Sequence, residues 1–264
     1  MLFRKLARVL LSKAAPLLSF EQAILVSKTL LEAQGFGSGG YIESSGETAI
    51  FRQLKGREPV LFDVGGHLGE YTEAFLMVHP AGHSYVFEPS ERHFQILAQR
   101  LSHCKNVTLL KCGLGDQEKE APLYKNAQIT GLASLTKRRL DHYGINMEMS
   151  ETVKVQTIDE IIRQQGIASV DLLKIDVEGH EFDVLKGATN AFRDHRINLV
   201  QFEFGGCNLD TRTCLSDFFY FFKEHAFTIG LIQPSGRIQM LSRYDEFFEQ
   251  YRTANFVAVP NHDA

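Results

Sequence analysis

The sequence lacks several features that define large classes of protein. Its 264 residues include no tryptophan, and the net charge is −4. A surface that follows a phosphate backbone usually needs net basic charge or a clear basic stripe, so this charge argues against nucleic acid as a partner. The one tight basic run, 137–139, is typical of a solvated surface. With 44% hydrophobic residues and no internal repeat, the chain can build one sizeable α/β core without a second domain.

Cysteine is also scarce. The four cysteines are Cys104, Cys112, Cys207 and Cys214. They form no Cys-x-x-Cys pair and have no zinc-finger spacing, so the sequence argues against a zinc site. Reduced thiols in a cytoplasmic protein are the simplest interpretation, and we therefore expect the protein in the cytoplasm.

A glycine-rich turn follows the first strongly apolar segment. Val60 to Gly69 reads Val-Leu-Phe-Asp-Val-Gly-Gly-His-Leu-Gly, which predicts a buried parallel strand that ends at Asp63 and turns into a helix. The dinucleotide fingerprint Gly-x-Gly-x-x-Gly needs a glycine at its third position, against the pyrophosphate, but His67 stands there. The missing glycine favours a cofactor without phosphates, such as S-adenosylmethionine.

The residues of this turn are predicted to bind the amino-acid end of that cofactor. Asp63 could accept a hydrogen bond from the ammonium group, directly or through water. The backbone amides from Gly65 through Gly66 to Gly69 could bind the same end, because glycine lets the backbone approach a ligand closely. His67 could pack on the cofactor or bond to it, and a solvent contact is the alternative.

Two further strand ends carry candidate cofactor residues. The next apolar segment, His83 to Phe87, is followed by Glu88, whose carboxylate could accept both ribose hydroxyls. The turn that contains Gly115 and Asp116 follows a third strand and could lie against the adenine, with a backbone amide or Asp116 reading the ring edge. A plain turn with an aspartate cap explains the same residues equally well.

Strand and helix patterns alternate along the chain, which predicts a parallel sheet. The last two expected strands, 227–233 and 255–259, are separated by a long excursion. A helix is expected over 181–192 and a strongly aromatic helix near 218–225. Because five aromatic residues in succession point around a whole helix, most of 218–222 should belong to the core rather than to a binding wall.

Three motifs resemble the FkbM family of S-adenosylmethionine-dependent methyltransferases. They are Asp63-Val64-Gly65 with Gly69, Phe87-Glu88-Pro89, and Lys174-Ile175-Asp176-Val177-Glu178-Gly179 with Glu181 and Val184-Leu185-Lys186-Gly187. The third motif is the most specific, and the resemblance spans roughly 47–260. Gly66 departs from the family pattern, which often shows alanine at this position.

The resemblance implies a class I methyltransferase (Rossmann-like) α/β fold, a mostly parallel seven-stranded sheet with an antiparallel edge strand and helices on both faces. It also implies methylation of a hydroxyl on a sugar, a glycan or a natural product. We expect a methyltransferase domain over 47–264, preceded by a helical extension and a flexible glycine-rich joint over 1–46. The pattern-poor segment 131–149 should set the acceptor specificity.

An acceptor hydroxyl must lose a proton during methyl transfer, and the sequence offers two sources of help. His180 could act as the general base, since unperturbed histidine has a pKa of about 6.5. Alternatively, Asp176, Glu178 and Glu203 could hold a divalent cation such as Mg²⁺ that lowers the hydroxyl pKa. Asp176 is also expected to position the reactants. Each role has a plainer alternative, because His180 could face solvent and Glu178 could be a helix N-terminal acid.

The first twenty residues contain four basic residues and no acid. The basic residues are Arg4, Lys5, Arg8 and Lys13. This pattern predicts an amphipathic basic helix, which is too short to span a membrane and lacks a signal-peptide cleavage site. Two roles suit such a helix, a weak contact with a membrane surface or packing on the catalytic domain.

Two other functions fit parts of the pattern. A nicotinamide-dependent oxidoreductase uses a related sheet, but His67 interrupts its fingerprint and no Tyr-x-x-x-Lys pair is present. A non-catalytic cofactor-binding or scaffold protein is the other alternative. Nothing in a scaffold requires Asp63, Glu88 and Asp176 at successive strand ends, which favours the enzyme.

Overall fold

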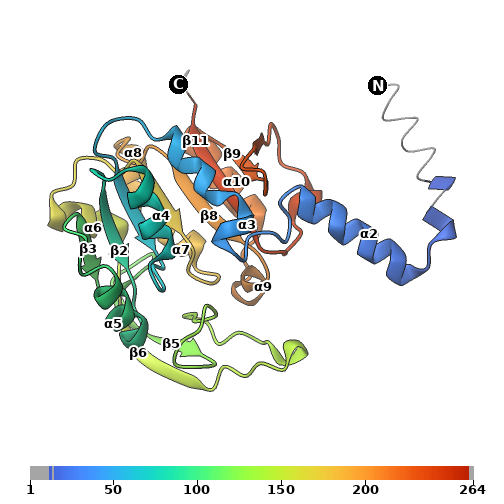
Figure 1. The fold of residues 1–264 in the computed structure, drawn as a ribbon, viewed down its shortest axis with the longest axis horizontal. Coiled ribbons are helices and arrows are strands. Elements are labelled where there is room, and N and C mark those ends of the chain that lie inside the picture. Colours follow the sequence, from blue (N-terminus) through green and yellow to red (C-terminus); the bar gives the residue numbers. More distant parts are fainter. Residues whose placement is uncertain (1–11, 14, 262–264) are drawn as a thin grey trace.

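The protein is built around one mainly parallel β-sheet with helices on both faces (Figure 1). The computed structural model describes residues 12–13 and 15–261. In their order across the main sheet, the strands are β10 (Ile238–Met240), β9 (Phe227–Ile232), β11 (Ala254–Pro260), β8 (Val200–Phe204), β7 (Leu172–Ile175), β1 (Val60–Val64), β2 (His83–Phe87) and β3 (Val107–Leu110).

Five neighbouring strands, from β8 through β7, β1 and β2 to β3, run parallel to one another. Strand β11 runs antiparallel between β8 and β9, and the predicted α/β fold class is confirmed. Two details differ from the expected sheet. The reversed strand β11 does not lie at the edge, because β9 covers its outer side. The short strand β10 adds an eighth member, since it forms a hairpin with β9.

Short helices connect the strands. They are α4 (Glu70–Val78), α5 (Glu91–Arg100), α6 (Ile158–Gln165), α7 (Glu181–Lys186), α8 (Thr189–Arg193), α9 (Cys207–Thr211) and α10 (Leu215–Glu224), with the 3-10 helix η4 (Glu246–Phe248) near the end. The single helix expected over 181–192 is divided at Gly187. A Cβ at Gly187 would lie 2.0 Å from the backbone oxygen of Gly115, so this close approach requires glycine.

Alternate side chains of the strands enter two apolar layers. In β1, Leu61 packs with residues of α4 on one face, whereas Phe62 and Val64 pack with α6, α7, α8 and α10 on the other. Phe218 and Phe222 of α10 are fully buried. This burial confirms that the aromatic helix belongs to the core.

A second, three-stranded sheet lies beside the main one (Figure 1). Its strands are β4 (Gly113–Leu114), β6 (Met149–Gln156) and β5 (Lys119–Lys125), in that order. The segment between β5 and β6 contains the 3-10 helix η3 (Asp141–Tyr143). Strand β6 therefore pairs with β4 and β5 in this small sheet and takes no part in the main one.

In the described part of the N-terminal region, four elements precede the main sheet. They are η1 (Ala15–Leu17), α2 (Phe20–Ala33), α3 (Ile42–Ser45) and η2 (Glu47–Gln53). Figure 1 shows α2 projecting from the body of the protein. The basic helix predicted over 1–20 lies mostly outside the described residues. Within the part of the chain that the structure describes, no helix is long and apolar enough to cross a membrane.

The glycine-rich stretch after α2 is attached to the body. The amides of Gly37 and Gly39 both donate to the backbone oxygen of Thr253, at 2.9 and 3.0 Å. Phe36 is buried in the main core. The glycine stretch therefore packs closely against the residue before β11, and the flexible joint stays a prediction.

The aromatic core suggests a direct test of stability. Phe202 of β8 is fully buried and stacks on Phe218, with 4.7 Å between the ring centroids. We expect Phe202→Ala to lower the free energy of unfolding by about 3–5 kcal/mol, because the substitution leaves a cavity. Tyr220→Ala is the control, since that side chain is exposed and should cost less than about 1 kcal/mol. Urea denaturation followed by circular dichroism measures both, and equal losses would contradict the prediction.

Candidate active site

A cleft of about 1030 Å³ opens where β1, β2, β7 and β8 end. Parallel strands bring their carboxyl ends to one edge of the sheet, which is where ligands bind in open α/β folds. The expected site residues that line the cleft are Gly65, Gly66, His67, Glu88, Asp176, Glu178, His180 and Glu203. The expected residues that do not line it are Asp63, Gly69, Gly115 and Asp116.

Gly65 and Gly66 shape the cleft through their backbone. A Cβ at Gly65, where φ is 87°, would lie 1.9 Å from the backbone oxygen of Asp176. A Cβ at Gly66 would lie 2.2 Å from Cγ1 of Val86, so alanine would fit only if that side chain moved. Both glycine amides donate to the backbone oxygen of Phe87, at 3.0 Å each. The amides expected to bind the cofactor therefore connect the end of β1 to β2.

Glu88 is a buried acid at the end of β2. Its Oε2 accepts from the amide of His67 at 2.9 Å, and its Oε1 accepts from the amide of Ser90 at 2.8 Å. Each carboxylate oxygen has a second lone pair, so two ribose hydroxyls could still bond to this group. The backbone amides hold the carboxylate in place before any ligand arrives, which suits the ribose-binding role.

Asp63 is fully buried behind the cleft rather than in its lining. Its Oδ2 accepts from the hydroxyl of Thr72 at 2.7 Å, while Oδ1 has no partner. Burial raises the pKa of Asp63, and the charge of Lys174 opposes this shift. Because Asp63 lies behind the lining, a bridging water suits a contact between its unpaired oxygen and an ammonium group in the cleft. A direct contact has less support.

His67 occupies the position where the dinucleotide fingerprint has glycine. Its φ is 46°, in the left-handed region, and its ring lies edge-on to His93 with 4.8 Å between centroids. Burial, reinforced by His93, lowers the pKa of His67. Its Nε2 is buried and has no partner. An unpaired ring nitrogen in the wall of the cleft fits a hydrogen bond to the cofactor.

The remaining residues that were expected to bind the cofactor, Gly69, Gly115 and Asp116, lie outside the lining of the cleft. Gly69 precedes α4 with φ of 90°. Asp116 is exposed and pairs with Lys119 at 3.0 Å. In the turn after β3, Gly113 and Leu114 line the cleft, whereas Gly115 does not. The structure thus places Gly113 and Leu114, rather than Gly115 and Asp116, in the lining of the cleft, and a contact between this turn and the adenine stays a prediction.

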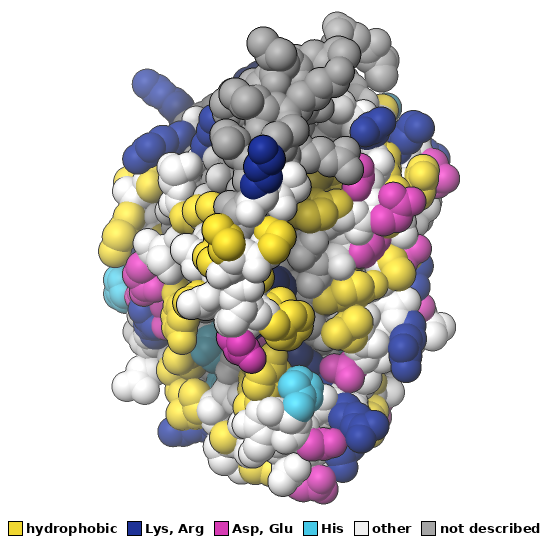
Figure 2. All heavy atoms as spheres, turned by 90° about the vertical axis from the view of Figure 1, so that its right-hand side faces the viewer, with side chains coloured by type: hydrophobic (Ala, Val, Ile, Leu, Met, Phe, Trp, Pro, Cys, Tyr) yellow, Lys and Arg dark blue, Asp and Glu magenta, His cyan; other side chains and the backbone are white. Residues whose placement is uncertain are grey.

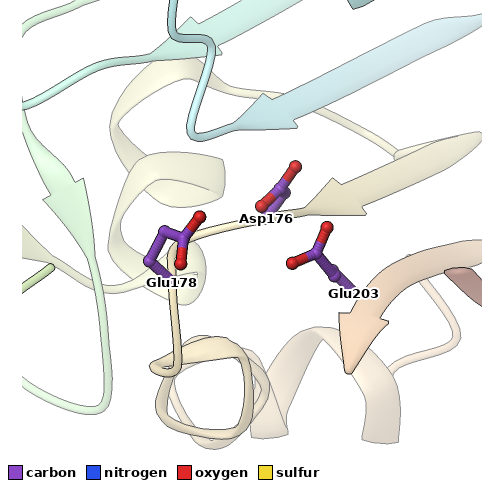
Figure 3. A group of neighbouring side chains, drawn as sticks. All are labelled: Asp176, Glu178 and Glu203. Carbon is purple, nitrogen blue, oxygen red and sulfur yellow. The ribbon is translucent and has the colours of Figure 1, made fainter. Parts of the chain in front are cut away.

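Three carboxylates meet at the opposite side of the cleft (Figure 3). One oxygen each of Asp176, Glu178 and Glu203 lie within 4.8 Å of one another. Burial and the charge of Asp176 raise the pKa of Glu178 to about 8 and that of Glu203 well above its usual range. Three negative charges so close together are unfavourable, so protons or positive groups must compensate them.

Two basic residues supply part of that compensation. The ammonium of Lys174 lies 2.9 Å from Oδ2 of Asp176. Burial by itself would lower the pKa of Lys174. The negative charges of Asp176, Asp63 and Glu47 outweigh burial, so the pKa is raised. Arg138 pairs with Glu178, and its side chain is only 8% exposed. The solvated surface expected for 137–139 is wrong for Arg138, because a basic run gives no sign of which member is buried.

A chain of buried polar groups extends from Lys174 into the sheet. Oε2 of Glu47 accepts from Nε2 of Gln201 at 2.7 Å, and Oε1 of Gln201 accepts from the hydroxyl of Tyr71 at 2.7 Å. The Lys174 ammonium lies 5.2 Å from the centroid of the Tyr71 ring. The sequence patterns did not indicate a role for Glu47, Gln201 or Tyr71. The only available signal was a polar Gln201 inside an otherwise apolar strand.

His180 has both ring nitrogens engaged. Nδ1 lies 2.9 Å from Oδ2 of Asp183, and Nε2 lies 2.9 Å from the hydroxyl oxygen of Thr136. The bond to His180, with Lys186 also close, lowers the pKa of Asp183 to about 2. A charged Asp183 favours the tautomer with the proton on Nδ1, which leaves the lone pair on Nε2. This residue does not simply face solvent, and it can accept a proton in the cleft.

This geometry defines a class of enzyme. A mainly parallel sheet with one reversed strand near its edge, a glycine turn after β1 and a buried acid after β2 describe a class I methyltransferase. The chain matches the Methyltransferase FkbM domain over residues 63–229. This match covers more than half of the chain, which therefore belongs to the FkbM methyltransferase family. Membership of this family implies S-adenosylmethionine as the methyl donor.

Several curated proteins are similar to this chain. Hexuronic acid methyltransferase AglP of Haloferax volcanii is 23% identical, over 72% of this chain and 81% of AglP. The 2-O-methyltransferase NoeI of Sinorhizobium fredii is 22% identical, over 58% of this chain and 67% of NoeI. The 31-O-demethyl-FK506 methyltransferase FkbM of Streptomyces tacrolimicus is 28% identical, over 50% of this chain and 60% of that protein.

Solved structures give a more distant likeness. An S-adenosylmethionine-dependent O-methyltransferase of Thermotoga maritima aligns with a TM-score of 0.44 and 11% identity, over 85% of this chain and 67% of that chain. Precorrin-6y C5,15-methyltransferase of Geobacter metallireducens aligns with a TM-score of 0.44 and 11% identity, over 82% and 88%. A likeness at this level carries no argument about acceptor or mechanism.

The cofactor residues can be tested by binding. We expect Glu88→Gln to weaken binding of S-adenosylhomocysteine at least tenfold, about 1.4 kcal/mol, because the amide replaces one acceptor oxygen by a donor. Asp116→Asn is the matched control and should bind normally, since Asp116 is exposed and outside the cleft. Isothermal titration measures both affinities. Unchanged binding in the Glu88 variant would remove it from the ribose site.

Proposed function

We propose that this methyltransferase transfers a methyl group to a hydroxyl of a sugar, glycan or natural-product acceptor. The observation that carries the proposal is that His180, oriented by Asp183, lines the same cleft as Glu88. A base and a ribose-binding acid in one cleft suit proton removal next to a bound methyl donor. The names of the relatives support an oxygen acceptor, since NoeI is a 2-O-methyltransferase and AglP a hexuronic acid methyltransferase.

The chain's own residues would perform three tasks. S-adenosylmethionine, when bound, supplies a methyl group on a positively charged sulfur. Glu88 binds its ribose, and His67 contacts its amino-acid end. Asp176, held by Lys174, positions the reacting groups at the end of β7. Alignment of the hydroxyl oxygen with the methyl carbon, in a site that excludes water, lowers the barrier to displacement.

His180 would remove the acceptor proton. Its Nε2 lies at hydrogen-bond distance from the hydroxyl of Thr136, and an acceptor hydroxyl would compete for the same lone pair. Asp183 stabilises the imidazolium that forms when Nε2 takes the proton, because it bonds to Nδ1. We therefore propose His180 as the catalytic base and Asp183 as its positioning residue.

This assignment predicts a selective loss of turnover. We expect His180→Gln to lower kcat by about 10²–10⁴-fold, because general base catalysis contributes that much, and to leave the affinity for S-adenosylhomocysteine unchanged. His103→Gln is the control, since that residue is exposed and outside the cleft. Methyl transfer to a panel of hydroxylated glycans provides the assay. A His180 variant with full activity would exclude the base.

The cluster of Asp176, Glu178 and Glu203 supports a second candidate mechanism. Carboxylate oxygens are the ligands that Mg²⁺ prefers, and the three groups are close enough to share one ion. A cation there would remove their mutual repulsion and lower the pKa of a bound hydroxyl. Lys174 and Arg138 pair with two of the three groups, so part of the negative charge is compensated without a metal ion.

Metal removal separates the two mechanisms. We expect methyl transfer to persist in EDTA and to change by less than about twofold on addition of Mg²⁺, because basic residues already balance the cluster. Complete loss in EDTA, with recovery in Mg²⁺ for the wild type but not for Glu203→Gln, would instead establish the cation as a catalytic partner.

Two exposed tyrosines suit recognition of the acceptor. Tyr41 and Tyr143 both line the cleft, and they are 77% and 72% exposed. Tyr41 comes from the N-terminal segment, whereas Tyr143 lies in the segment 131–149 that the sequence assigns to acceptor specificity. Aromatic rings at the mouth of a cleft can stack on a sugar ring, which is a role that tryptophan fills in other proteins. We propose that these two side chains bind the acceptor.

Kinetic measurements test whether Tyr41 and Tyr143 bind the acceptor. We expect Tyr41→Ala and Tyr143→Ala each to raise the acceptor KM by about fivefold or more, through loss of an aromatic contact worth about 1 kcal/mol, with no change in S-adenosylhomocysteine binding. Tyr220→Ala is the control, because Tyr220 is exposed on α10 and outside the cleft. An unchanged acceptor KM in both cleft variants would refute the assignment.

The catalytic unit should extend beyond the expected boundary. Gly37 and Tyr41 line the cleft, so we propose that residues 35–46 belong functionally to the domain expected over 47–264.

All four cysteines are free, which agrees with the expectation of reduced thiols. Location of the protein in the cytoplasm stays a prediction.

A further inference from the structure

Helix α2 and the turn before it expose a cluster of apolar side chains. No residue of α2 is buried. The exposed large apolar residues from η1 to the end of α2 are Leu17, Leu18, Phe20, Ile24, Leu25, Val26 and Leu30. Contiguous apolar surface is rare on soluble monomers and marks interaction sites. This cluster is therefore the strongest feature of the described residues that the methyltransferase reaction does not use.

The apolar side chains of α2 have helical spacing. Phe20, Ala23, Val26 and Leu30 follow one another at intervals of three or four residues, which places them along one side of the helix. Figure 1 shows this helix projecting from the body, and Figure 2, which views that end of the molecule, shows hydrophobic side chains exposed there. The helix presents an amphipathic surface rather than scattered apolar residues.

Local interactions stabilise α2 although it has little contact with the core. Ser19 begins the helix with a capping box, in which its side chain accepts from the amide of Gln22 and the Gln22 side chain accepts from the amide of Ser19. At the other end, Arg252 pairs with Glu32 at 2.6 Å. The helix is thus formed before any partner binds, so docking carries no cost of folding it.

The base of α2 lies next to the mouth of the cleft. Arg252, which pairs with Glu32 of the helix, also lines the cleft. Tyr41, which follows the glycine stretch after α2, is exposed in the same lining. A surface bound by α2 would therefore lie close to the opening through which an acceptor enters.

The charge of the preceding sequence identifies the partner. Residues 1–20 carry four basic side chains and no acid. Apolar side chains that follow a basic segment bind anionic lipid surfaces, where burial and charge attraction act together. A second copy of the chain is the alternative occupant, but the basic residues that precede α2 offer it no complementary charge, whereas an anionic surface does. We propose that α2 docks on an anionic lipid surface and holds the cleft near it.

Vesicle co-sedimentation of the full chain tests this proposal. We expect the wild type to sediment with phosphatidylcholine vesicles that contain phosphatidylglycerol, and less with phosphatidylcholine alone or at high salt. The double variant Val26→Gln with Leu30→Gln should lose about tenfold in vesicle affinity, because it makes the apolar side polar and keeps helix propensity. The triple variant Arg4→Gln, Lys5→Gln and Arg8→Gln should lose the preference for phosphatidylglycerol.

A matched control separates this effect from general surface hydrophobicity. Met77→Gln with Val78→Gln changes two exposed apolar residues at the end of α4, and it should sediment like the wild type. Unchanged S-adenosylhomocysteine binding confirms that each variant is folded. Equal sedimentation of the two double variants, or wild type that stays in the supernatant, would overturn the proposal. Dimers of the wild type that dissociate in the α2 variant without vesicle binding would assign the surface to a second copy instead.

Discussion

The site depends on the attraction between the buried ammonium group of Lys174 and the acidic side chains around it. This ammonium group bonds to Asp176 at the end of β7, and the charges of Asp63 and Glu47 also favour its protonated form. These acids come from β1 and from η2, so one cation stabilises three separate segments at the floor of the cleft. Removal of one partner from a buried ion pair typically costs about 3–5 kcal/mol, because the remaining charge stays buried. Catalytic geometry and stability are therefore coupled at this residue.

The side of the cleft near Glu88 depends on a different feature, the hydrogen bonds that backbone amides after β1 donate to the end of β2. The amides of Gly65 and Gly66 donate to the backbone oxygen of Phe87, and the amide of His67 donates to the carboxylate of Glu88. The turn and Glu88 are thereby one unit, which forms before a ligand binds. Such preorganisation lowers the cost of binding, because the polar groups need not be rearranged.

On the side of the cleft that contains His180, three residues of the segment between β5 and β6 contact the loop after β7. The Ser134 hydroxyl donates to the backbone oxygen of Glu178, Thr136 contacts His180, and Arg138 pairs with Glu178. This segment therefore contacts the loop after β7 at three points. His180, the acidic cluster and the segment that reaches the mouth of the cleft are thus connected through direct side-chain contacts.

The sequence alone determined the local features of the protein. Apolar strands that end in acids, the glycine turn and the motif after β7 are patterns of neighbouring residues, and they correctly predicted the fold class. Glu88 and the acidic cluster lie in the cleft, and their roles stay predictions. The tertiary structure decided which distant residues meet. It brought Glu47 to Gln201, buried Arg138 within a basic run, and directed Asp116 away from the cleft. The physical reason is that burial and partner choice depend on the path of the whole chain, whereas strand, turn and helix preferences are set within a few residues.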